Sequence, residues 1–438
     1  RFRMAPRHLN PQRFRTIPMS TPLVFKFGGA SVKDAQSVRN VVAIIERYPD
    51  RPMVVVVSAM GKMTNAFESV VSSWAQEDLP GATRALQGIQ DFHEGIITEL
   101  FEQIPTDLQK DLAQWYEDLG QLVQQSNRSY SEQYDSIVHH GELISTRIVQ
   151  AFVNTRIPAL WLDTRTLIKT DDLFRRATVK WGPTQECISA AVQESKVYFV
   201  QGFIGSDPAG RPTTLGREGS DYTGAVFAYC LGANSLTIWK DVPGMLNGDP
   251  KTFQNTKLIE ELPFGEAIEL AFYGASIIHP KTIQPLQKKG IPLRIRSFVD
   301  PAATGTVITS ADQATPQVPN FILKKNQALL SISTKDLAFI AEYHLSAVYQ
   351  LFAEKGVVVN MMRNTATEAV FCLNNDAIIV PKVIAALQSD FNLTFTSDVE
   401  LLTIRHYNES DVVRETEGLT ILQEQRTPDT VQFAFQRN

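Results

Sequence analysis

The sequence predicts an α/β protein: a three-layer αβα domain with a mainly parallel sheet over residues 21–310, followed by small α+β modules over 321–438. Three observations support this prediction. The chain has 438 residues, more than one ordinary core contains. Short apolar runs alternate with helical patterns through the first domain. After a stretch rich in Pro, Thr and Ala at 301–320, the rhythm changes to closely spaced strands.

The first elements form a β-α-β unit. The runs 23–27 and 53–58 are continuously apolar, which is typical of strands buried on both faces. Between them, apolar residues recur at helical spacing and define one helix face: Val38, Val41, Val42 and Ile45. A helix between two such strands indicates parallel pairing with a right-handed crossover.

The rest of the first domain continues this alternation. Residues 65–155 have a mainly helical pattern. Further buried strands are expected at 157–161, 197–203, 235–239 and 291–295. Helical patterns between several of these strands predict helices on both faces of the sheet. The stretch 301–320 is expected to be a linker, or a surface loop followed by an edge strand.

The last part of the chain predicts a ferredoxin-like module with the order β-α-β-β-α. Its strands are expected at 328–333, 357–362 and 368–373, with helices around 345–352 and at 378–388. Three more strands are expected at 400–405, 419–425 and 431–436. Because only about a dozen residues separate the first two of these, we expect the second module to be truncated and to lack its helix.

Composition narrows the class of protein. The formal net charge of −5 argues against broad nucleic-acid binding, and no apolar segment is long enough to span a bilayer. Three widely spaced cysteines fit neither a zinc site nor a disulfide framework, which favours the cytoplasm. Residues 1–20 contain five arginines and no acidic residue, so we expect a basic, disordered arm; a transit-peptide remnant is the alternative.

Three loops contain the residues best suited to chemistry. In Lys26-Phe27-Gly28-Gly29 a strand ends in a glycine turn before a helix, an arrangement that can present backbone amides and a lysine to phosphate. Taken alone, it is equally a tight turn. The loop 213–224 combines Arg217, suited to bind a carboxylate, with Asp221, which could orient a lysine or simply cap the next helix.

The third loop, WKDVPGMLNGDPK at 239–251, follows a predicted strand and contains two turns. Parallel sheets bind ligands beyond the carboxyl ends of their strands. Three such loops in one domain, each with glycine and charge, favour a site for a nucleotide and an acid over three independent turns.

Five motifs occur in a diagnostic order: KFGGASV (26–32), HGELIS (140–145), TTLGREGSDYT (213–223), KDVPG (240–244) and YGASIIHP (273–280). Together they resemble the aspartate kinases of the amino acid kinase family, which have ACT regulatory modules after the catalytic domain. The resemblance covers nearly everything from residue 22 onward. It implies the amino acid kinase fold and a monofunctional enzyme. The implied reaction is ATP-dependent phosphorylation of the side-chain carboxylate of L-aspartate, the first step of lysine, threonine and methionine biosynthesis.

The resemblance also implies residue roles. Lys26, with the amides of Gly28 and Gly29, stabilises the transferred phosphoryl group, and Asp221 organises the lysine side of the transfer. The residues implied for aspartate binding are Ser58, Thr64, Glu142 for the ammonium group, Thr214, Arg217 for the α-carboxylate, and Ser220. Those implied around ATP are Lys240, Asp241, Asp249 and Lys251. Because a carboxylate is already an ionised nucleophile, no general base is required. Mg²⁺ is expected on the ATP phosphates, without a protein cage.

Several positions depart from the family pattern. Ala30 replaces a threonine, Glu218 a glycine, Leu246 an aromatic residue and Ser276 a lysine, and we hypothesise that Lys240 partly supplies the charge missing at Ser276. In the regulatory half, Asn360 replaces an aspartate that contacts an effector's ammonium group. The ACT modules therefore have two possible roles: inhibition by lysine or threonine, or dimerisation alone. A homodimer is expected because the modules have exposed sheet edges. The alternatives are an amino acid kinase acting on glutamate or N-acetylglutamate, and a non-catalytic amino-acid sensor.

Overall fold

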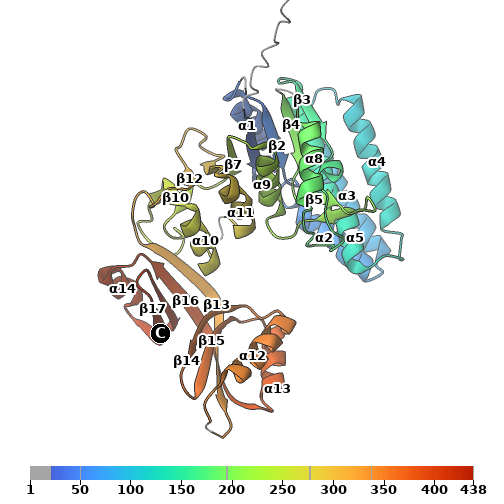
Figure 1. The fold of residues 1–438 in the computed structure, drawn as a ribbon. Helices are drawn as coiled ribbons and strands as arrows, with labels where there is room; N and C mark the ends of the chain where they lie inside the picture. The colour runs from blue at the N-terminus through green and yellow to red at the C-terminus, as the bar shows by residue number, and fades with distance from the viewer. Residues whose placement is uncertain (1–20, 50, 194–195, 276–277, 337, 438) are drawn as a thin grey trace, which may run out of the picture.

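The computed structural model describes residues 21–49, 51–193, 196–275, 278–336 and 338–437. The expected basic arm and the departure at Ser276 lie outside the described residues. The catalytic domain is built on an eight-stranded sheet (Figure 1). In spatial order the strands are β10 (Glu261–Pro263), β12 (Thr306–Thr309), β11 (Leu293–Ser297), β7 (Ser235–Lys240), β1 (Leu23–Phe27), β2 (Met53–Val57), β4 (Val197–Gln201) and β3 (Ala159–Leu162).

Strand β1 is central and parallel to both neighbours. Phe25 is paired with Val55 of β2 on one side and with Thr237 of β7 on the other. Its side chains alternate between two cores: Phe25 packs in one apolar cluster, and Val24 in the other. A strand with apolar residues on both faces needs a helical layer on each. The fold class predicted from the continuous apolar runs is confirmed.

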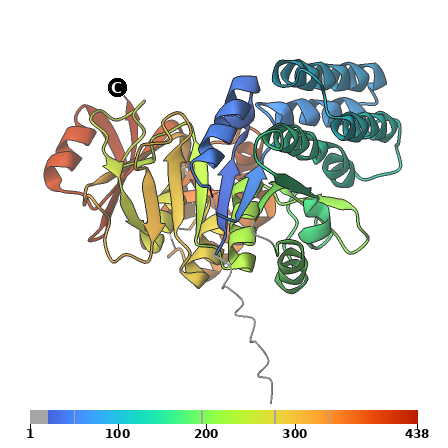
Figure 2. The ribbon, with the colours of Figure 1, turned by 90° about the horizontal axis from the view of Figure 1, so that it is seen from above.

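One helical layer contains η1 (Gly29–Val32), α1 (Ala35–Glu46), α2 (Met63–Ala75), α3 (Leu79–Leu100), α4 (Thr106–Leu122), α5 (Tyr130–Val138) and α6 (His140–Val153). The other contains α7 (Thr164–Leu167), α8 (Trp181–Ala191), α9 (Gly219–Leu231), α10 (Phe264–Tyr273) and α11 (Pro280–Lys289). Figure 2 shows the two layers on opposite sides of the sheet. Two small two-stranded hairpins lie outside this sheet: β5 (Ile204–Ser206) with β6 (Pro212–Thr214), and β8 (Met245–Leu246) with β9 (Leu258–Ile259). None of the described helices combines the length and apolar character that crossing a bilayer requires.

For the stretch 301–320 the expectation was a linker, or a surface loop followed by an edge strand; the strand is present, but it is not at the edge of the sheet. This stretch contains β12, which lies between β10 and β11 and runs antiparallel to β11. The catalytic sheet therefore includes this part of the chain. Strand β10 takes the edge position instead, a pairing that no local strand period reports.

The regulatory region is one six-stranded antiparallel sheet in the order β14-β15-β13-β16-β18-β17. Its elements are β13 (Asn320–Thr334), α12 (Glu342–Lys355), β14 (Val359–Asn364), β15 (Glu368–Asn374), α13 (Ile379–Leu387), β16 (Phe391–Arg405), α14 (Glu409–Thr416), β17 (Leu419–Arg426) and β18 (Thr430–Arg437). Strands β13 and β16 are each long enough to belong to both modules, so the two modules share one sheet.

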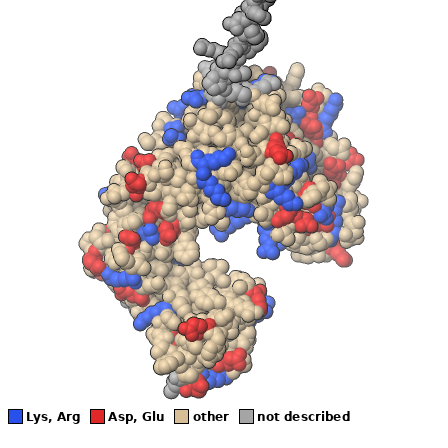
Figure 3. Space-filling view, viewed as in Figure 1, with Lys and Arg blue, Asp and Glu red and all other residues tan. Residues whose placement is uncertain are grey.

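The prediction that the second module lacks its helix was wrong. Helix α14 lies between β16 and β17, with Asn408 as its cap: the Asn408 side chain accepts a hydrogen bond from the Asp411 amide at 2.9 Å. Val412 buries its side chain in the module's apolar cluster. So short a helix is unstable alone and depends on this cap and packing. The catalytic domain and the regulatory region meet on one side and leave a hollow on the other (Figure 3).

Candidate active site

A cleft of about 1070 Å³, called here the central cleft, opens beyond the carboxyl ends of β1, β2 and β7. This is where a parallel α/β sheet is expected to bind ligands. It brings together eight of the residues singled out in the sequence, from segments far apart in the chain: Lys26, Ser58, Thr64, Glu142, Arg217, Ser220, Asp221 and Lys240.

Asp221 lies between two lysines at the floor of the central cleft. Its Oδ1 is 2.6 Å from Nζ of Lys26, on β1, and its Oδ2 is 3.6 Å from Nζ of Lys240, at the end of β7. Burial alone raises the pKa of the Asp221 carboxyl, but the two lysines outweigh burial and lower it. Asp221 is therefore ionised and holds two ammonium groups at fixed positions.

The glycine turn after β1 packs against the loop after β2. A Cβ atom on Gly29 would lie 2.6 Å from the carbonyl oxygen of Gly61 and 2.8 Å from that of Ala59, so only glycine fits there. The Gly61 amide donates a hydrogen bond of 3.0 Å to the Gly29 carbonyl. A Cβ on Gly28 would come within 3.2 Å of Lys26 Nζ. Close packing thus explains Gly29, and Gly28 leaves space around Lys26.

Glu142 lies in the first turn of α6 and is only 2% exposed. Its Oε1 accepts a hydrogen bond of 3.3 Å from the Ala59 amide, while its buried Oε2 has no hydrogen-bond partner among the described residues. Burial raises the pKa of this carboxyl to about 8, against the opposing effects of the Ala59 amide and the Lys26 charge. A buried carboxylate oxygen without a partner is costly, so this site is suited to receive a cation.

Ser58 and Thr64 flank the loop between β2 and α2, on the wall of the central cleft. The Ser58 backbone is held on both sides: its amide donates to the Phe27 carbonyl at 3.1 Å, and its carbonyl accepts from the Ser145 hydroxyl at 2.6 Å. The two hydroxyl side chains therefore stand on a well-anchored loop.

Thr214 is placed differently from the other predicted residues. It is fully buried, and both its amide and its hydroxyl donate to the carboxylate of Asp135, at 2.8 and 2.7 Å. The same carboxylate accepts from the Arg175 amide at 3.0 and 3.1 Å. Burial raises the pKa of Asp135, against the opposing effect of these hydrogen bonds. Thr214 thus shapes the wall of the central cleft from behind.

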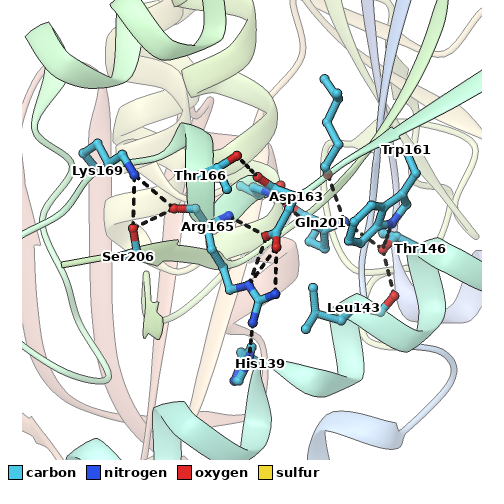
Figure 4. A network of polar contacts seen from close by, with 12 residues as sticks. His139, Leu143, Thr146, Trp161, Asp163, Arg165, Thr166, Lys169, Gln201 and Ser206 are labelled. Atoms are coloured by element: carbon cyan, nitrogen blue, oxygen red, sulfur yellow. Dashed lines mark hydrogen bonds and ion pairs between the residues drawn. The ribbon is translucent and has the colours of Figure 1, made fainter. Parts of the chain in front are cut away.

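A polar network missed in the sequence supports the junction of α5 and α6 (Figure 4). The Arg165 guanidinium forms hydrogen bonds to the Asp163 carboxylate at 2.7 to 3.1 Å, and its Nη1 lies 3.2 Å from Nε2 of His139. A guanidinium can only donate, so Nε2 accepts and Nδ1 of His139 donates to the Asp135 carbonyl at 2.9 Å. Burial holds the pKa of His139 well below its usual range. The neutral ring fixes the start of the helix that carries Glu142.

A second cleft of about 520 Å³, called here the adjoining cleft, shares Lys240 with the central cleft. Asp241 and Asp249 line its mouth, and its walls are mostly apolar: Val242, Met245, Leu246, Leu270, Ile322 and Leu323. Lys251 is exposed and lines neither cleft, and its amide donates to the Asp249 carboxylate at 2.9 Å. Apolar walls with a few charged groups at the mouth are suited to a planar base bearing phosphates.

Within the described residues, no group of three or more His, Cys, Asp or Glu side chains is arranged to hold a metal ion. Asp221, the acidic group nearest the two lysines, is already neutralised by them. Mg²⁺ bound with a nucleotide usually takes one or two protein carboxylates beside phosphates and waters, so the described residues are compatible with an ion carried by the phosphates.

Comparison with known proteins finds relatives that cover most of this chain. The model of the amino acid kinase family matches residues 21–297. The chain is 31% identical over 364 residues to the lysine-sensitive aspartokinase 3 of Escherichia coli, a match that spans 81% of this chain and 79% of that protein. The crystal structure of E. coli aspartokinase III with aspartate and ADP superposes with a TM-score of 0.80 at 25% identity, covering 95% of this chain and 96% of that one. The same enzyme with lysine and aspartate gives a TM-score of 0.77 at 26% identity, with coverage of 94% and 95%.

Proposed function

This chain belongs to the amino acid kinase family, and we propose that it is an aspartate kinase that transfers the γ-phosphoryl group of ATP to the side-chain carboxylate of L-aspartate, forming 4-phospho-L-aspartate. The observation that most directly supports this is the group formed by Lys26, Asp221 and Lys240 in the same cleft as the buried carboxylate of Glu142. One part of the cleft suits a migrating phosphoryl group, and another suits an ammonium group.

The central cleft provides complementary groups for an acidic amino acid. The unpartnered Oε2 of Glu142 receives the ammonium group of aspartate, and its desolvation is then compensated. Arg217, on the rim, binds the α-carboxylate. The hydroxyls of Ser58, Thr64 and Ser220 surround the remaining polar atoms. Thr214 contributes indirectly, because its own hydroxyl is donated to Asp135.

The adjoining cleft takes the nucleotide. Its apolar walls receive the base, Asp241 and Asp249 stand at its mouth, and Lys240 lies where the two clefts meet. Lys251 lines neither cleft, so its side chain must move before it can contact the phosphates. Mg²⁺ would be held mainly by the phosphates of ATP and by water, with its charge offsetting that of the phosphates.

The reaction then requires positioning and charge neutralisation. A carboxylate oxygen of aspartate forms a bond to the γ-phosphorus while the bond from that phosphorus to the β,γ-bridging oxygen breaks, and ADP leaves with the bond's electrons. The Lys26 ammonium group, fixed by Asp221, lies where negative charge accumulates on the transferred group. No proton has to be removed from the nucleophile, so no residue acts as a general base.

A coupled ADP-release assay across three acceptors tests this function. We expect turnover with L-aspartate and none above background with L-glutamate or N-acetyl-L-glutamate, and trapping with hydroxylamine should identify the acyl phosphate. A Lys26→Met variant serves as the inactive control. Turnover with another acceptor and none with aspartate would contradict the proposal. Nucleotide binding without ADP release would favour the amino-acid sensor.

For the regulatory region we propose an amino-acid effector, with lysine as the first candidate because E. coli aspartokinase III has been solved with lysine bound. Here the Asn360 amide is already engaged: its Oδ1 accepts from Lys324 at 2.7 Å, and its Nδ2 lies 2.6 Å from Gln327 and 2.7 Å from Asn374. An incoming ammonium group must open this network. Calorimetric titration with lysine and with threonine tests the proposal, and heat from neither, in a protein that sediments as a dimer, would support the dimerising role.

A further inference from the structure

Arg175 has an unusual backbone conformation on the wall of the central cleft. Its φ is 67°, in the left-handed region, where a residue with a Cβ atom is strained. The conformation is held by the buried Asp135 carboxylate, which accepts from the Arg175 amide with both oxygens. Strained residues are concentrated at functional sites, where contacts with the surrounding structure hold them in the strained conformation.

The Arg175 side chain is also held in place, but not by an acid. Its guanidinium carbon lies 4.7 Å from the centre of the Tyr134 ring and 5.5 Å from that of Tyr130, both on α5. Among the described residues, no carboxylate lies within ion-pair distance of it. A guanidinium resting on aromatic rings is oriented while its hydrogen-bond donors stay available.

Arg175 and Arg217 stand on loops that touch. A Cβ atom on Gly216 would lie 3.3 Å from the carbonyl oxygen of Arg175, so the two backbones pack directly. Asp135 joins these loops as well, because it binds Thr214, three residues before Arg217, together with the Arg175 amide. Arg175 and Arg217 therefore line the central cleft from one anchored corner, and Arg176, next to Arg175 in the chain, lines the cleft as well.

This corner belongs to the acceptor end of the central cleft. Tyr134, beneath Arg175, donates a hydrogen bond of 2.6 Å to Glu68 on α2, the helix that also carries Thr64. The nucleotide enters from the other direction, where Lys240 joins the adjoining cleft. Arg175 lines the central cleft and is absent from the adjoining one.

We propose that Arg175 is a specificity-determining residue that binds the α-carboxylate of the acidic acceptor together with Arg217. The inference rests on the proposed aspartate kinase activity and adds a residue to it. Two guanidinium groups on one carboxylate favour an acceptor with a free α-carboxylate over one in which that group is an amide. The amide has no negative charge, and its N–H donors would face the N–H donors of the guanidinium groups.

Steady-state kinetics with two acceptors test the proposal. In Arg175→Met we expect the KM for L-aspartate to rise about tenfold, with kcat within about twofold and the KM for ATP unchanged, because a contact made equally in ground and transition states affects KM alone. The decisive measurement is selectivity. The ratio of kcat/KM for L-aspartate to that for its α-amide, L-isoasparagine, should fall about tenfold in the variant.

Two further variants provide a second test and a matched control. Arg175→Gly suits the left-handed backbone, so it removes the guanidinium without a folding penalty and should reproduce the loss of selectivity. Arg156→Met removes another exposed arginine that rests on an aromatic ring, 5.8 Å from Phe152 and outside both clefts, and should leave selectivity unchanged. The inference would be overturned if both Arg175 variants kept the wild-type selectivity, that is, if kcat/KM fell equally, or not at all, for the two acceptors. As long as the wild type is active on aspartate, that result leaves the proposed function standing. A wild-type protein without activity on aspartate would instead overturn the proposed function, and the inference with it.

Discussion

Nζ of Lys26 lies 2.6 Å from Oδ1 of Asp221, and this ion pair joins the central strand of the catalytic sheet to the first turn of α9. The other oxygen of the same carboxylate faces Nζ of Lys240 at 3.6 Å. Asp221 is 3% exposed, so little solvent weakens these interactions. One buried carboxylate thus fixes two cations at the point where the central and adjoining clefts meet.

The first prediction concerns this carboxylate. Asp221→Asn removes the charge that holds both lysines, and the two ammonium groups then repel each other. We expect kcat to fall by at least about 100-fold, with a small change in the KM for aspartate, because the lysines act on charge that develops during transfer. Asp207→Asn is the control: Asp207 is also buried but pairs with Arg211, outside both clefts. A kcat loss of equal size in both variants would contradict the prediction.

Lys240 is predicted to act mainly on the nucleotide. It is the predicted lysine that lines both clefts, and its ammonium group is oriented by Asp221. In Lys240→Met we expect the KM for ATP to rise about tenfold and kcat to fall, while the KM for aspartate stays within about twofold. Lys288→Met, on the exposed end of α11, is the matched control. Unaltered KM for ATP and kcat in Lys240→Met would show that Lys240 supplies no charge to the phosphates.

Glu142 is predicted to make aspartate binding depend on pH. Burial raises the pKa of its carboxyl to about 8, and below that pH the free enzyme holds it protonated, which weakens the contact with an ammonium group. We therefore expect kcat/KM for aspartate to rise with pH up to about 8 and then level off. Glu142→Gln should be low and flat over the same range. A wild-type profile as flat as that of the variant would contradict the assignment.

The same pKa predicts how the ligand-free protein's stability varies. Between about pH 4.5 and 8 the folded state keeps a proton on Glu142 that the unfolded chain has lost. The contribution of this group to the free energy of unfolding therefore decreases as pH rises through that window. Thermal unfolding of the wild type and of Glu142→Gln should diverge with rising pH, the variant becoming the more stable of the two. A constant difference across the window would be evidence against a raised pKa.

Glu218 is predicted to destabilise the protein. Its φ is 54°, and its buried Oε2 has no hydrogen-bond partner among the described residues. Glu218→Gly relieves left-handed strain, worth about 1 kcal/mol, and removes a buried unpaired oxygen, worth about 1–3 kcal/mol. Glu77, with φ 58° and an exposed side chain, is the matched control, because Glu77→Gly relieves backbone strain alone. Denaturant unfolding should show a larger gain for Glu218→Gly, and equal gains would contradict this explanation.

The sequence predicted most of the catalytic fold and the residues at the strand ends, because both are local patterns. Runs such as 53–58 show a buried strand without reference to other segments, and the motif order placed Lys26 and Asp221 in one site. A strand within 301–320 was among the expectations, but the position of β12 inside the sheet was not. The eight-residue helix α14 was missed, because it is stabilised by neighbours in the fold and not by its own pattern.

Sequence patterns also failed to predict the residues whose role depends on partners far away in the chain. Asp135 appears in the sequence as an ordinary helical acid, yet it binds the amide of Thr214, 79 positions away. Arg175 gives no local signal of its left-handed backbone, and the pairing of Arg165, in α7, with His139, between α5 and α6, joins positions 26 apart in the chain. Burial and contacts between segments give these side chains their function, and no spacing rule reports either.

The last prediction concerns the contact between regulatory region and catalytic domain. Arg405, in β16, donates to both oxygens of Glu266, in α10, at 2.8 and 2.7 Å, and Arg405 is only 8% exposed.

Removing one partner of a buried ion pair leaves the other charge uncompensated, so Arg405→Met should lower the free energy of unfolding by about 3 kcal/mol. The double variant Arg405→Met with Glu266→Met removes both charges and should recover most of that loss.

The stability that this ion pair contributes should also depend on pH. Burial alone raises the pKa of Glu266, but Arg405 and His406 outweigh burial and lower it. The pair therefore stabilises the fold above the ordinary glutamate pKa, and this stabilisation is lost on acidification. Helix α10 also supplies Leu270 to the adjoining cleft, so we expect Arg405→Met to raise the KM for ATP and not that for aspartate. Equal destabilisation in the single and double variants would show that the two side chains contribute by packing and not as an ion pair.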